Sequence, residues 1–302
     1  MSRSEEVVGF WSFRVEPAEK LSPLEASKGW DKAASWWVSR YTSRGDLNRE
    51  WVIDPILFDW LGDVHGLNVL DAGCGEGYLS RLLAERGARV VGVDLSGELL
   101  AVAKKRENRK RLGVMYRRAD LANLSAFPSE NFDIAVSNIV LVDVAHYREA
   151  IGEIFRVLKR GGRFLFCITH PAFEGPVPGK WVREPIDSFR IEDRRFLAVD
   201  RYFDRVAVFW GPPDGSVVVG GFHRPLRDYF EALYEAGFLV SRFEEPTASK
   251  EALAKRFYYF ADLERVPLFL IIEAVKPERK QKVKVVGRAK KGEKKARSAW
   301  IM

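Results

Sequence analysis

The sequence predicts an α/β protein built on a doubly wound, largely parallel sheet. Two observations point to this class. Short apolar runs alternate with helical runs from Gly66 to His170. The first apolar run leads directly into a turn that holds three glycines within five residues, Gly73, Gly75 and Gly77. Strands and helices that alternate at this spacing are typical of βαβ units, in which a helix connects two parallel strands.

Each element of this core follows from its own pattern. The continuous apolar run at 67–73 predicts a buried strand. The segment 77–87 predicts a helix, because its leucines share one face and Gly87 ends the run. Further strands are expected at 88–95, 114–120, 131–141 and 163–170, and further helices at 97–113 and at 147–162, where paired glycines end the helix.

Two regions flank or interrupt this core. Residues 1–65 look mostly helical and are expected to form a lid segment. Residues 171–222 contain six prolines and two apolar runs that predict short antiparallel strands, so we interpret them as a cap insertion over the C-terminal edge of the sheet. The core then resumes with a helix at 225–238, a strand at 239–246, a helical connection and a last strand at 268–275, which brings the sheet to seven strands.

The charge of the chain is unevenly distributed. The net charge is +7, but residues 276–302 alone hold 11 Lys or Arg and two Glu. The other 275 residues therefore hold 38 basic and 40 acidic side chains. The basic character belongs to a C-terminal tail, which we expect to be disordered, and not to the body of the protein.

Several protein classes are not expected. No uninterrupted run of 18 apolar residues predicts a transmembrane helix, and the N-terminus does not resemble a signal peptide. The two cysteines, Cys74 and Cys167, suggest neither a disulfide framework nor a cysteine-based zinc site. We therefore expect a cytoplasmic protein without a metal site or a membrane partner.

The glycine turn raises the question of which ligand it holds. A turn between a strand and a helix brings backbone N–H groups close to a ligand, and a dinucleotide-binding fold is the first alternative. The glycines are spaced G-x-G-x-G and not G-x-G-x-x-G, and the turn begins with Asp71. Asp94 and Asp120 follow the next two strands. Carboxylates repel a pyrophosphate, so these acids favour an adenosyl ligand with a cationic amino-acid end.

The acids suggest specific roles. Asp94 can accept hydrogen bonds from both ribose hydroxyls, Asp120 from the adenine amino group, and Asp71 from an amine. Gly73 and Gly75 would let the backbone approach the amino-acid portion closely. The alternative is that each acid caps the helix or turn after its strand, and this alternative fits Asp120 better than the other two.

Four stretches resemble the class I S-adenosylmethionine-dependent methyltransferase family. They are "VLDAGCGEGYLSRLLAERGARVVGVDLS", "RRADL", "FDIAVSNIVLVD" and "EIFRVLKRGGRFLFCITHP". The resemblance implies a Rossmann-like sheet with an antiparallel last strand in a domain at 66–275, covered by N-terminal helices. It also implies S-adenosylmethionine as cofactor and an acceptor of the small-molecule, methyltransferase-11-like type. The cofactor-binding residues expected are Asp71, Ala72, Gly73, Cys74, Gly75, Asp94, Leu95, Asp120, Leu121 and Asn138.

The expected reaction is methyl transfer to an oxygen or nitrogen atom, for which the protein supplies orientation and, for some acceptors, a base. The strand end "SNIVLVD" lacks the Asn/Asp-Pro-Pro-aromatic signature of enzymes that methylate amino groups of nucleic acids. Cys167 lies in an apolar strand and is expected to be a core thiol. His170 and His223 are the candidate general bases, with a structural role as the alternative for both. Glu245 and Asp143 are weaker candidates.

Other functions stay open. One is an RNA or ribosomal-component methyltransferase that uses the basic tail to bind phosphates. Another is a non-catalytic adenosyl-binding protein. The oligomeric state is not predicted. Eight aromatic residues are candidates for the wall of an acceptor pocket, with packing between cap and sheet as the alternative: Trp36, Trp37, Tyr41, Phe173, Trp181, Tyr202, Phe203 and Trp210.

Overall fold

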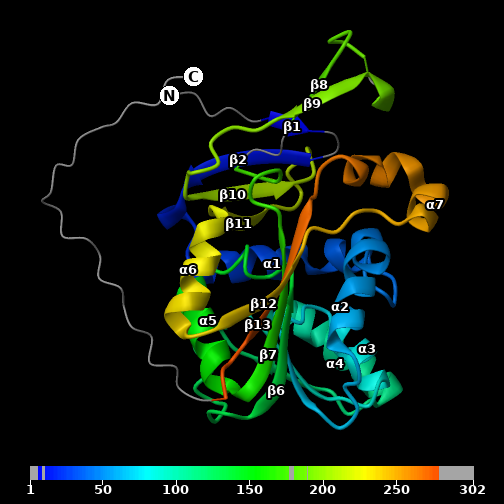
Figure 1. Ribbon diagram of the computed structural model, residues 1–302. Helices are drawn as coiled ribbons and strands as arrows, with labels where there is room; N and C mark the ends of the chain where they lie inside the picture. The colour runs from blue at the N-terminus through cyan, green and yellow to red at the C-terminus, as the bar shows by residue number, and fades with distance from the viewer. Residues whose placement is uncertain (1–5, 9–10, 177–179, 189, 279–302) are drawn as a thin grey trace, which may run out of the picture.

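The computed structural model describes residues 6–8, 11–176, 180–188 and 190–278. Its centre is a seven-stranded sheet in the order β12-β13-β7-β6-β3-β4-β5 (Figure 1). The pairings from β7 to β5 are parallel, whereas β13 is antiparallel to both of its neighbours. This arrangement confirms the predicted fold. The strands are β3 (Asn68–Ala72), β4 (Arg89–Asp94), β5 (Met115–Arg118), β6 (Phe132–Asn138), β7 (Leu158–Thr169), β12 (Leu239–Glu244) and β13 (Phe269–Val275).

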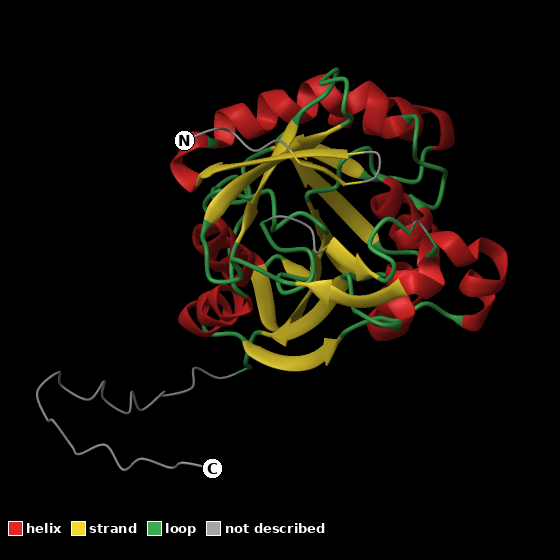
Figure 2. Ribbon diagram, turned by 90° about the horizontal axis from the view of Figure 1, so that it is seen from above, coloured by secondary structure: helices red, strands yellow, loops and turns green. Residues whose placement is uncertain are grey.

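Helices cover both faces of this sheet (Figures 1 and 2). On one face, α2 (Asp54–Leu61), α3 (Tyr78–Glu85) and α4 (Gly97–Lys110) bury their leucines against β3, β4 and β6. On the other face, α5 (Tyr147–Val157) and α6 (Leu226–Ala236) pack side by side. A third apolar cluster joins α7 (Lys250–Phe260) to β7 and β13. The amphipathic patterns seen in the sequence therefore match the faces that are buried.

A second, four-stranded sheet has the order β1-β2-β10-β11. It combines β1 (Glu6–Val8) and β2 (Trp11–Pro17) with β10 (Val206–Gly211) and β11 (Val219–His223) of the insertion. The central pair is antiparallel and places Phe13 opposite Trp210. The segment predicted as mostly helical thus also contributes two strands that the sequence did not predict. The insertion adds one more unpredicted hairpin, β8 (Lys180–Arg183) with β9 (Arg194–Ala198).

The long helix α1 (Pro23–Val38) connects the two sheets (Figure 1). Its N-terminus carries a capping box, in which the side chains of Ser22 and Glu25 each accept a hydrogen bond from the other residue's backbone. Ala33 packs against Val217 and Val219 near β11, and α1 also contacts α4 of the main domain. The helix is therefore placed directly above the C-terminal edge of the parallel strands.

Two predicted boundaries are wrong: the end of the helix expected at 147–162 and the start of the C-terminal tail at Lys276. Lys276 is involved in both. The helix expected at 147–162 ends at Val157, and β7 begins at Leu158. The ammonium of Lys276 donates to the carbonyls of Phe155 (2.8 Å) and Leu158 (2.6 Å), which satisfies the end of α5. Lys276 was assigned to the tail, yet it is buried and its backbone pairs with Gly162. The rest of the predicted tail, 279–302, lies outside the described residues.

Short 3-10 and π-helical turns complete the described structure: η1 (Ala18–Lys20), η2 (Arg49–Ile53), η3 (Ile191–Asp193) and η4 (Ala261–Glu264). Within the described ranges, no helix combines the length and apolar character needed to cross a membrane.

Candidate active site

Two neighbouring cavities lie at the C-terminal ends of the parallel strands. The first is formed by the loops that follow β3, β4, β5 and β6 and is covered by α1. Every residue predicted to bind the cofactor lines this cavity except Ala72, which is fully buried inside β3. Residues chosen from separate strand ends are therefore brought together, as the topology of a parallel sheet requires.

The glycine turn after β3 shapes the floor of the first cavity. Gly73 has φ +84°, and a Cβ at this position would lie 2.3 Å from a methyl carbon of Val140. The N–H groups of Gly73 and Cys74 both donate to the carbonyl of Val93, at 2.8 and 2.9 Å. A side chain at Gly73 would be strained and would also push the β6 loop away. Cys74 is buried, and burial raises the pKa of its thiol, which indicates that the side chain packs in the loop.

The three predicted acids are held differently. Asp71 accepts a hydrogen bond of 2.5 Å from the Ser80 hydroxyl, and burial raises its pKa to about 7. Asp94 accepts from the backbone N–H groups of Gly75 and Ser96, both at 2.8 Å, and burial also raises its pKa. Asp120 accepts from the N–H of Ala122 at 2.9 Å, so it stabilises a turn as well as lining the cavity.

The charge of the first cavity selects the kind of ligand that fits. Among the described lining residues, Arg49 is the one Lys or Arg side chain. Glu76 pairs with Arg81 and Arg106, which do not line the cavity. The excess of acids suits a ligand that carries positive charge and disfavours a pyrophosphate, the alternative raised by the glycine turn. The lining carboxyl groups are Asp71, Glu76, Asp94, Asp120 and Asp143.

Arg49 was not predicted from the sequence. It is buried, pairs with Asp46 and donates to the carbonyl of Asn138 at 3.5 Å. Its Nε has no hydrogen-bond partner in the described part of the chain, and neither has Oδ1 of Asn138. A buried donor or acceptor without a partner destabilises the folded protein. A zwitterionic ligand could supply both partners, a carboxylate for Nε of Arg49 and an ammonium group for Oδ1 of Asn138.

Helix α1 is fastened over this cavity by hydrogen bonds to the β4 loop. Ser27 donates to the carbonyl of Leu95 at 3.2 Å, and Ser96 donates to Asp31 at 2.6 Å. The same Ser96 hydroxyl accepts from Leu99 and caps α4. The helix predicted as part of a lid therefore lies against the cofactor loops.

The second cavity has a volume of about 610 Å³, which is in the usual range for a small-molecule site. It lies between the four-stranded sheet, α1 and the ends of β6 and β7. Three of the eight candidate aromatic residues line it, Trp37, Tyr41 and Trp210, and the other five do not. It meets the first cavity along six residues that line both: Trp30, Trp37, Tyr41, Arg49, Ile139 and Asp143.

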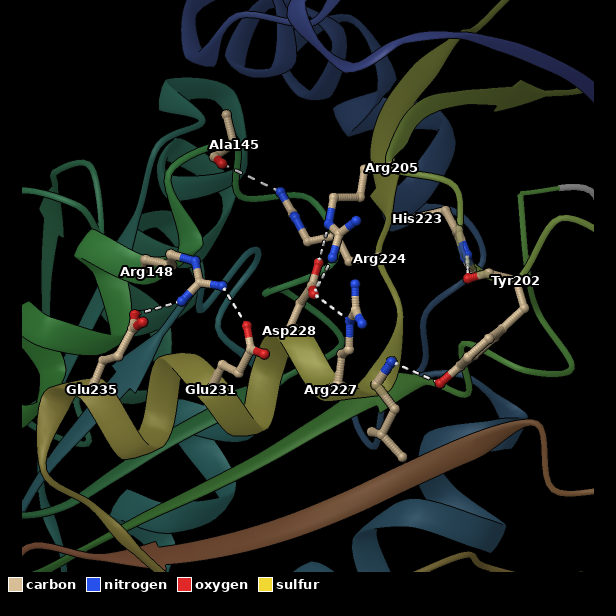
Figure 3. A network of polar contacts seen from close by, with 11 residues as sticks. Ala145, Arg148, Tyr202, Arg205, His223, Arg224, Arg227, Asp228, Glu231 and Glu235 are labelled. Atoms are coloured by element: carbon tan, nitrogen blue, oxygen red, sulfur yellow. Dashed lines mark hydrogen bonds and ion pairs between the residues drawn. The ribbon is translucent and has the colours of Figure 1, made fainter. Parts of the chain in front are cut away.

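His223 lies at the end of β11 and lines the second cavity. Its Nε2 is 2.9 Å from the carbonyl oxygen of Tyr202 (Figure 3). Because a carbonyl can only accept, the proton of the neutral ring must be on Nε2, and Nδ1 carries a lone pair. No described residue donates to Nδ1. Burial lowers the pKa of His223, so the ring is neutral at pH 7.

His170 is arranged differently. Its Nδ1 accepts from the N–H of Ala172 at 3.2 Å, and its Nε2 is 2.9 Å from a carboxylate oxygen of Glu245. Both ring nitrogens are therefore engaged, and the ring packs against Phe173. His170 and Glu245 line neither cavity. This geometry argues against His170 and Glu245 as general bases and favours a structural role for the pair.

Two carboxyl groups in the second cavity have no hydrogen-bond donor among the described residues. Asp143 follows β6 and lines both cavities. Burial raises its pKa to about 8, and burial raises the pKa of Glu174 to about 7. A Cβ on Gly221 of β11 would lie 2.6 Å from Oδ1 of Asp143. The absence of a side chain at Gly221 therefore makes room for this carboxyl.

The cap also fixes the loop that carries Asp143. Arg224 donates to the carbonyls of Leu141 (3.2 Å), Val144 (2.6 Å) and Ala145 (3.3 Å). Figure 3 shows the guanidinium reaching this loop beside the Arg205–Asp228 ion pair at the start of α6. The N–H of Phe222 adds a 2.6 Å bond to Val142. The insertion and the sheet are thus joined at the boundary between the cavities.

Asp143→Asn should change how stability depends on pH. The folded protein keeps the Asp143 proton up to a pKa of about 8, whereas the ordinary value is 3.8. The contribution of this group to the stability of the wild type is therefore lost as the pH rises from 3.8 through about 8. The asparagine of the variant does not titrate, so the variant does not lose stability in this way. We expect the melting temperature of the variant, relative to wild type, to increase by at least about 2–4 °C between pH 5 and pH 9, the shift that about 1 kcal/mol produces, because the assigned pKa corresponds to more than this energy.

Thermal melts at both pH values test this expectation. The exposed carboxylate of Asp59 on α2 provides the control, since Asp59→Asn should show no such trend. A constant difference between Asp143→Asn and wild type at the two pH values would contradict the assigned pKa.

Comparison with known proteins gives concordant results. Residues 70–166 match a family model described as a methyltransferase domain. Ubiquinone biosynthesis O-methyltransferases from Hahella chejuensis and Coxiella burnetii are each 31% identical, over 155 and 164 residues. The match covers 50% of this chain and 63% of the Hahella protein, and 53% of this chain and 68% of the Coxiella protein. The chain thus spans about two thirds of the length of these relatives.

A solved S-adenosylmethionine-dependent methyltransferase from Mesorhizobium loti is similar over 78% of this chain and 100% of its own, with a TM-score of 0.62 and 30% identity. A structure from Listeria monocytogenes, described as a putative methyltransferase of the same kind, is similar over 73% and 95%, with a TM-score of 0.59 and 27% identity. Sequence and structure therefore point to the same class of protein.

Proposed function

Because the chain belongs to the S-adenosylmethionine-dependent methyltransferase family, we propose that it transfers a methyl group to an oxygen or nitrogen atom of a small organic acceptor. The observation that carries this proposal is the pair of joined cavities. The first is acidic and is built on the glycine turn, and the second is aromatic and opens from it along six shared residues.

The residues of the first cavity suit S-adenosylmethionine. Asp94 would hold the ribose hydroxyls and Asp120 the adenine amino group, since each carboxylate oxygen can accept more than one hydrogen bond. Asp71 and Oδ1 of Asn138 would accept from the ammonium group, and Arg49 would face the carboxylate. When bound, the cofactor supplies a methyl group activated by its sulfonium. The remaining work falls to the protein: to orient the acceptor, exclude water and take up a proton where one is lost.

We propose His223 as the group that takes up this proton. Its Nδ1 has a lone pair, its Nε2–H is fixed by the carbonyl of Tyr202, and it lines the acceptor cavity. A base held in one tautomer and kept neutral by burial is ready to accept a proton at neutral pH. His170 has no comparable free nitrogen.

A small-molecule acceptor is favoured over RNA. The relatives are named for ubiquinone biosynthesis, and the 275 residues before the tail hold 38 basic and 40 acidic side chains, which argues against a broad nucleic-acid-binding face. The second cavity, which adjoins the first, favours a protein that also binds an acceptor over one that only binds the adenosyl group. We also propose a reducing, cytoplasmic compartment, because both cysteines are free and buried.

The test uses S-adenosylmethionine that carries an isotopic label on its methyl group. The purified chain is incubated with fractions of a cell metabolite extract, and each fraction is analysed for labelled products and for S-adenosylhomocysteine. We expect both to appear together in at least one fraction. Cofactor binding measured by calorimetry, without product in any fraction, would instead support the non-catalytic alternative.

A further inference from the structure

We infer that the second cavity selects acceptors that carry an amine on an apolar or aromatic body. The inference depends on the proposed function only in that the occupant of this cavity is the methyl acceptor. It follows from three properties of the cavity: two carboxyl groups and one imidazole nitrogen have no hydrogen-bond donor among the described residues, each cationic side chain has a protein partner, and the walls are aromatic.

The unmatched groups are Asp143, Glu174 and Nδ1 of His223. In the described part of the chain, no side chain or backbone N–H donates to either carboxyl group or to this nitrogen. His223 is buried, with 5% of its surface exposed. Gly175 brings the Glu174 segment close to His223, because a Cβ on Gly175 would lie 3.7 Å from Cε1 of the ring. Three hydrogen-bond acceptors on residues that line the cavity thus have no donor among the described residues.

The cationic side chains of this cavity already have protein partners. Arg49 pairs with Asp46, and its Nε, which has no partner among the described residues, is assigned to the carboxylate of the cofactor. The guanidinium of Arg224 donates to three loop carbonyls. Arg40 donates to the carbonyl of Trp36 at 3.0 Å and stacks on its ring at 3.7 Å. An acceptor with a carboxylate would therefore bring a second set of negative charges next to Asp143 and Glu174 without a free cation to balance them.

The walls suit a cation with an apolar body. Trp30, Trp37 and Trp210 form one group of rings, with centroids between 5.1 and 6.1 Å apart. Tyr41 extends this group at 5.2 Å from Trp37. Aromatic faces attract ammonium groups as well as apolar surface, and the attraction is stronger where water is excluded.

Proton release gives this inference a signature. At pH 7.5 Asp143 and Glu174 are partly protonated, because burial raises the pKa of each. Arg224 and Arg49 lower the pKa of Asp143, and Asp94 raises it. Asp262 raises the pKa of Glu174 further. An ammonium placed beside these carboxyls favours their charged form, so binding should expel protons. A neutral or anionic ligand should not expel them.

Calorimetry on the full chain saturated with S-adenosylhomocysteine tests the inference, because the carboxylate of this ligand would occupy Arg49. The probes are 2-phenylethylamine, 2-phenylethanol and phenylacetate, which share one ring and differ in charge. Titrations at pH 7.5 in two buffers with different ionisation enthalpies give the number of protons released. We expect the amine to bind at least about tenfold more tightly than the other two, which corresponds to one charge-assisted hydrogen bond, and to release protons.

Variants locate the effect. Glu174→Gln and Asp143→Asn should each weaken the amine by about tenfold or more and reduce the protons released, whereas Asp59→Asn on the exposed face of α2 should bind like wild type. Melting curves identify any variant that fails to fold, and Glu174→Gln alone is sufficient if Asp143→Asn does not fold.

Equal or tighter binding of phenylacetate or 2-phenylethanol would overturn the inference, as would amine binding without proton release. Saturation by none of the probes up to about 10 mM would also count against it. Selective amine binding without methyl transfer to any metabolite would defeat the proposed function and leave the ligand class standing. Methyl transfer only to hydroxyl groups would defeat the inferred ligand class and leave the proposed function standing.

Discussion

Replacing His223 by alanine is expected to lower the turnover rate by about 10²–10⁴-fold, the usual contribution of a positioned general base. Cofactor affinity should be largely retained, because His223 lines the second cavity and not the first. In the wild type, the rate should rise with pH through the pKa of the ring, which burial places below its ordinary value of 6.5. The measurement is the pH profile of kcat for the labelled methyl group.

Two further variants make this test decisive. His223→Asn keeps a polar group but cannot titrate, so it should flatten the acid limb of the profile. An amine acceptor has its own titration and would leave an acid limb in this variant too. His170→Ala is the matched control: it should reduce stability by removing the contacts with Glu245 and Ala172, while the rate per folded molecule stays within a few-fold. Full activity in His223→Ala would remove this base from the mechanism.

The second large effect is expected for Asp94→Ala. This change should weaken S-adenosylmethionine and S-adenosylhomocysteine alike, because the ribose is the same before and after transfer. Losing a charge-assisted, two-pronged hydrogen bond should cost about 1.5–3 kcal/mol, or roughly 10–150-fold in Kd. Calorimetry with both ligands measures it.

The fold around Asp94 requires a companion variant. Asp94 also accepts from the N–H groups of Gly75 and Ser96, so alanine removes supports of the turn as well as the ribose contact. Asp94→Asn keeps one acceptor for these bonds and removes the charge, and it should weaken both ligands by a smaller factor. Equal affinity of wild type and Asp94→Ala for both ligands would rule out the ribose assignment.

The grouping of the predicted cofactor-binding residues around one cavity could be foreseen because its information is local. Asp71, Asp94 and Asn138 each stand at the end of a strand whose pattern is continuous in the sequence. The carboxyl ends of parallel strands meet at one edge, so the topology alone brings such residues together. Arg49 was missed because it lies in a π-helical turn between helices, where no motif marks it. Asp46, three residues earlier, was its only nearby signal.

The parts that the sequence did not reveal depend on distant partners. The strand β2 has an ordinary alternating pattern, but its partner β10 lies on the far side of the main domain in the sequence. The carbonyls at the early end of α5 are satisfied by Lys276, which follows the last strand and looks like part of a basic tail in the sequence. His170 and His223 each stand at the end of an apolar run that predicts a strand. Only the hydrogen-bond partners in the folded protein distinguish their roles. Pairing of this kind is a property of the folded chain.

The mixed origin of the four-stranded sheet matters for how acceptor choice can be inherited or redesigned. Its central pair joins Phe13 near one end of the chain to Trp210 in the insertion, and both line the acceptor cavity. In a chimera that receives only the insertion of a relative, β10 would come from the relative and β2 from this protein, so the two strands would not be matched to each other. Recombination should therefore preserve function mainly when the two segments are exchanged together, so the pair of segments, and not the insertion alone, is the unit to exchange when acceptor choice is redesigned.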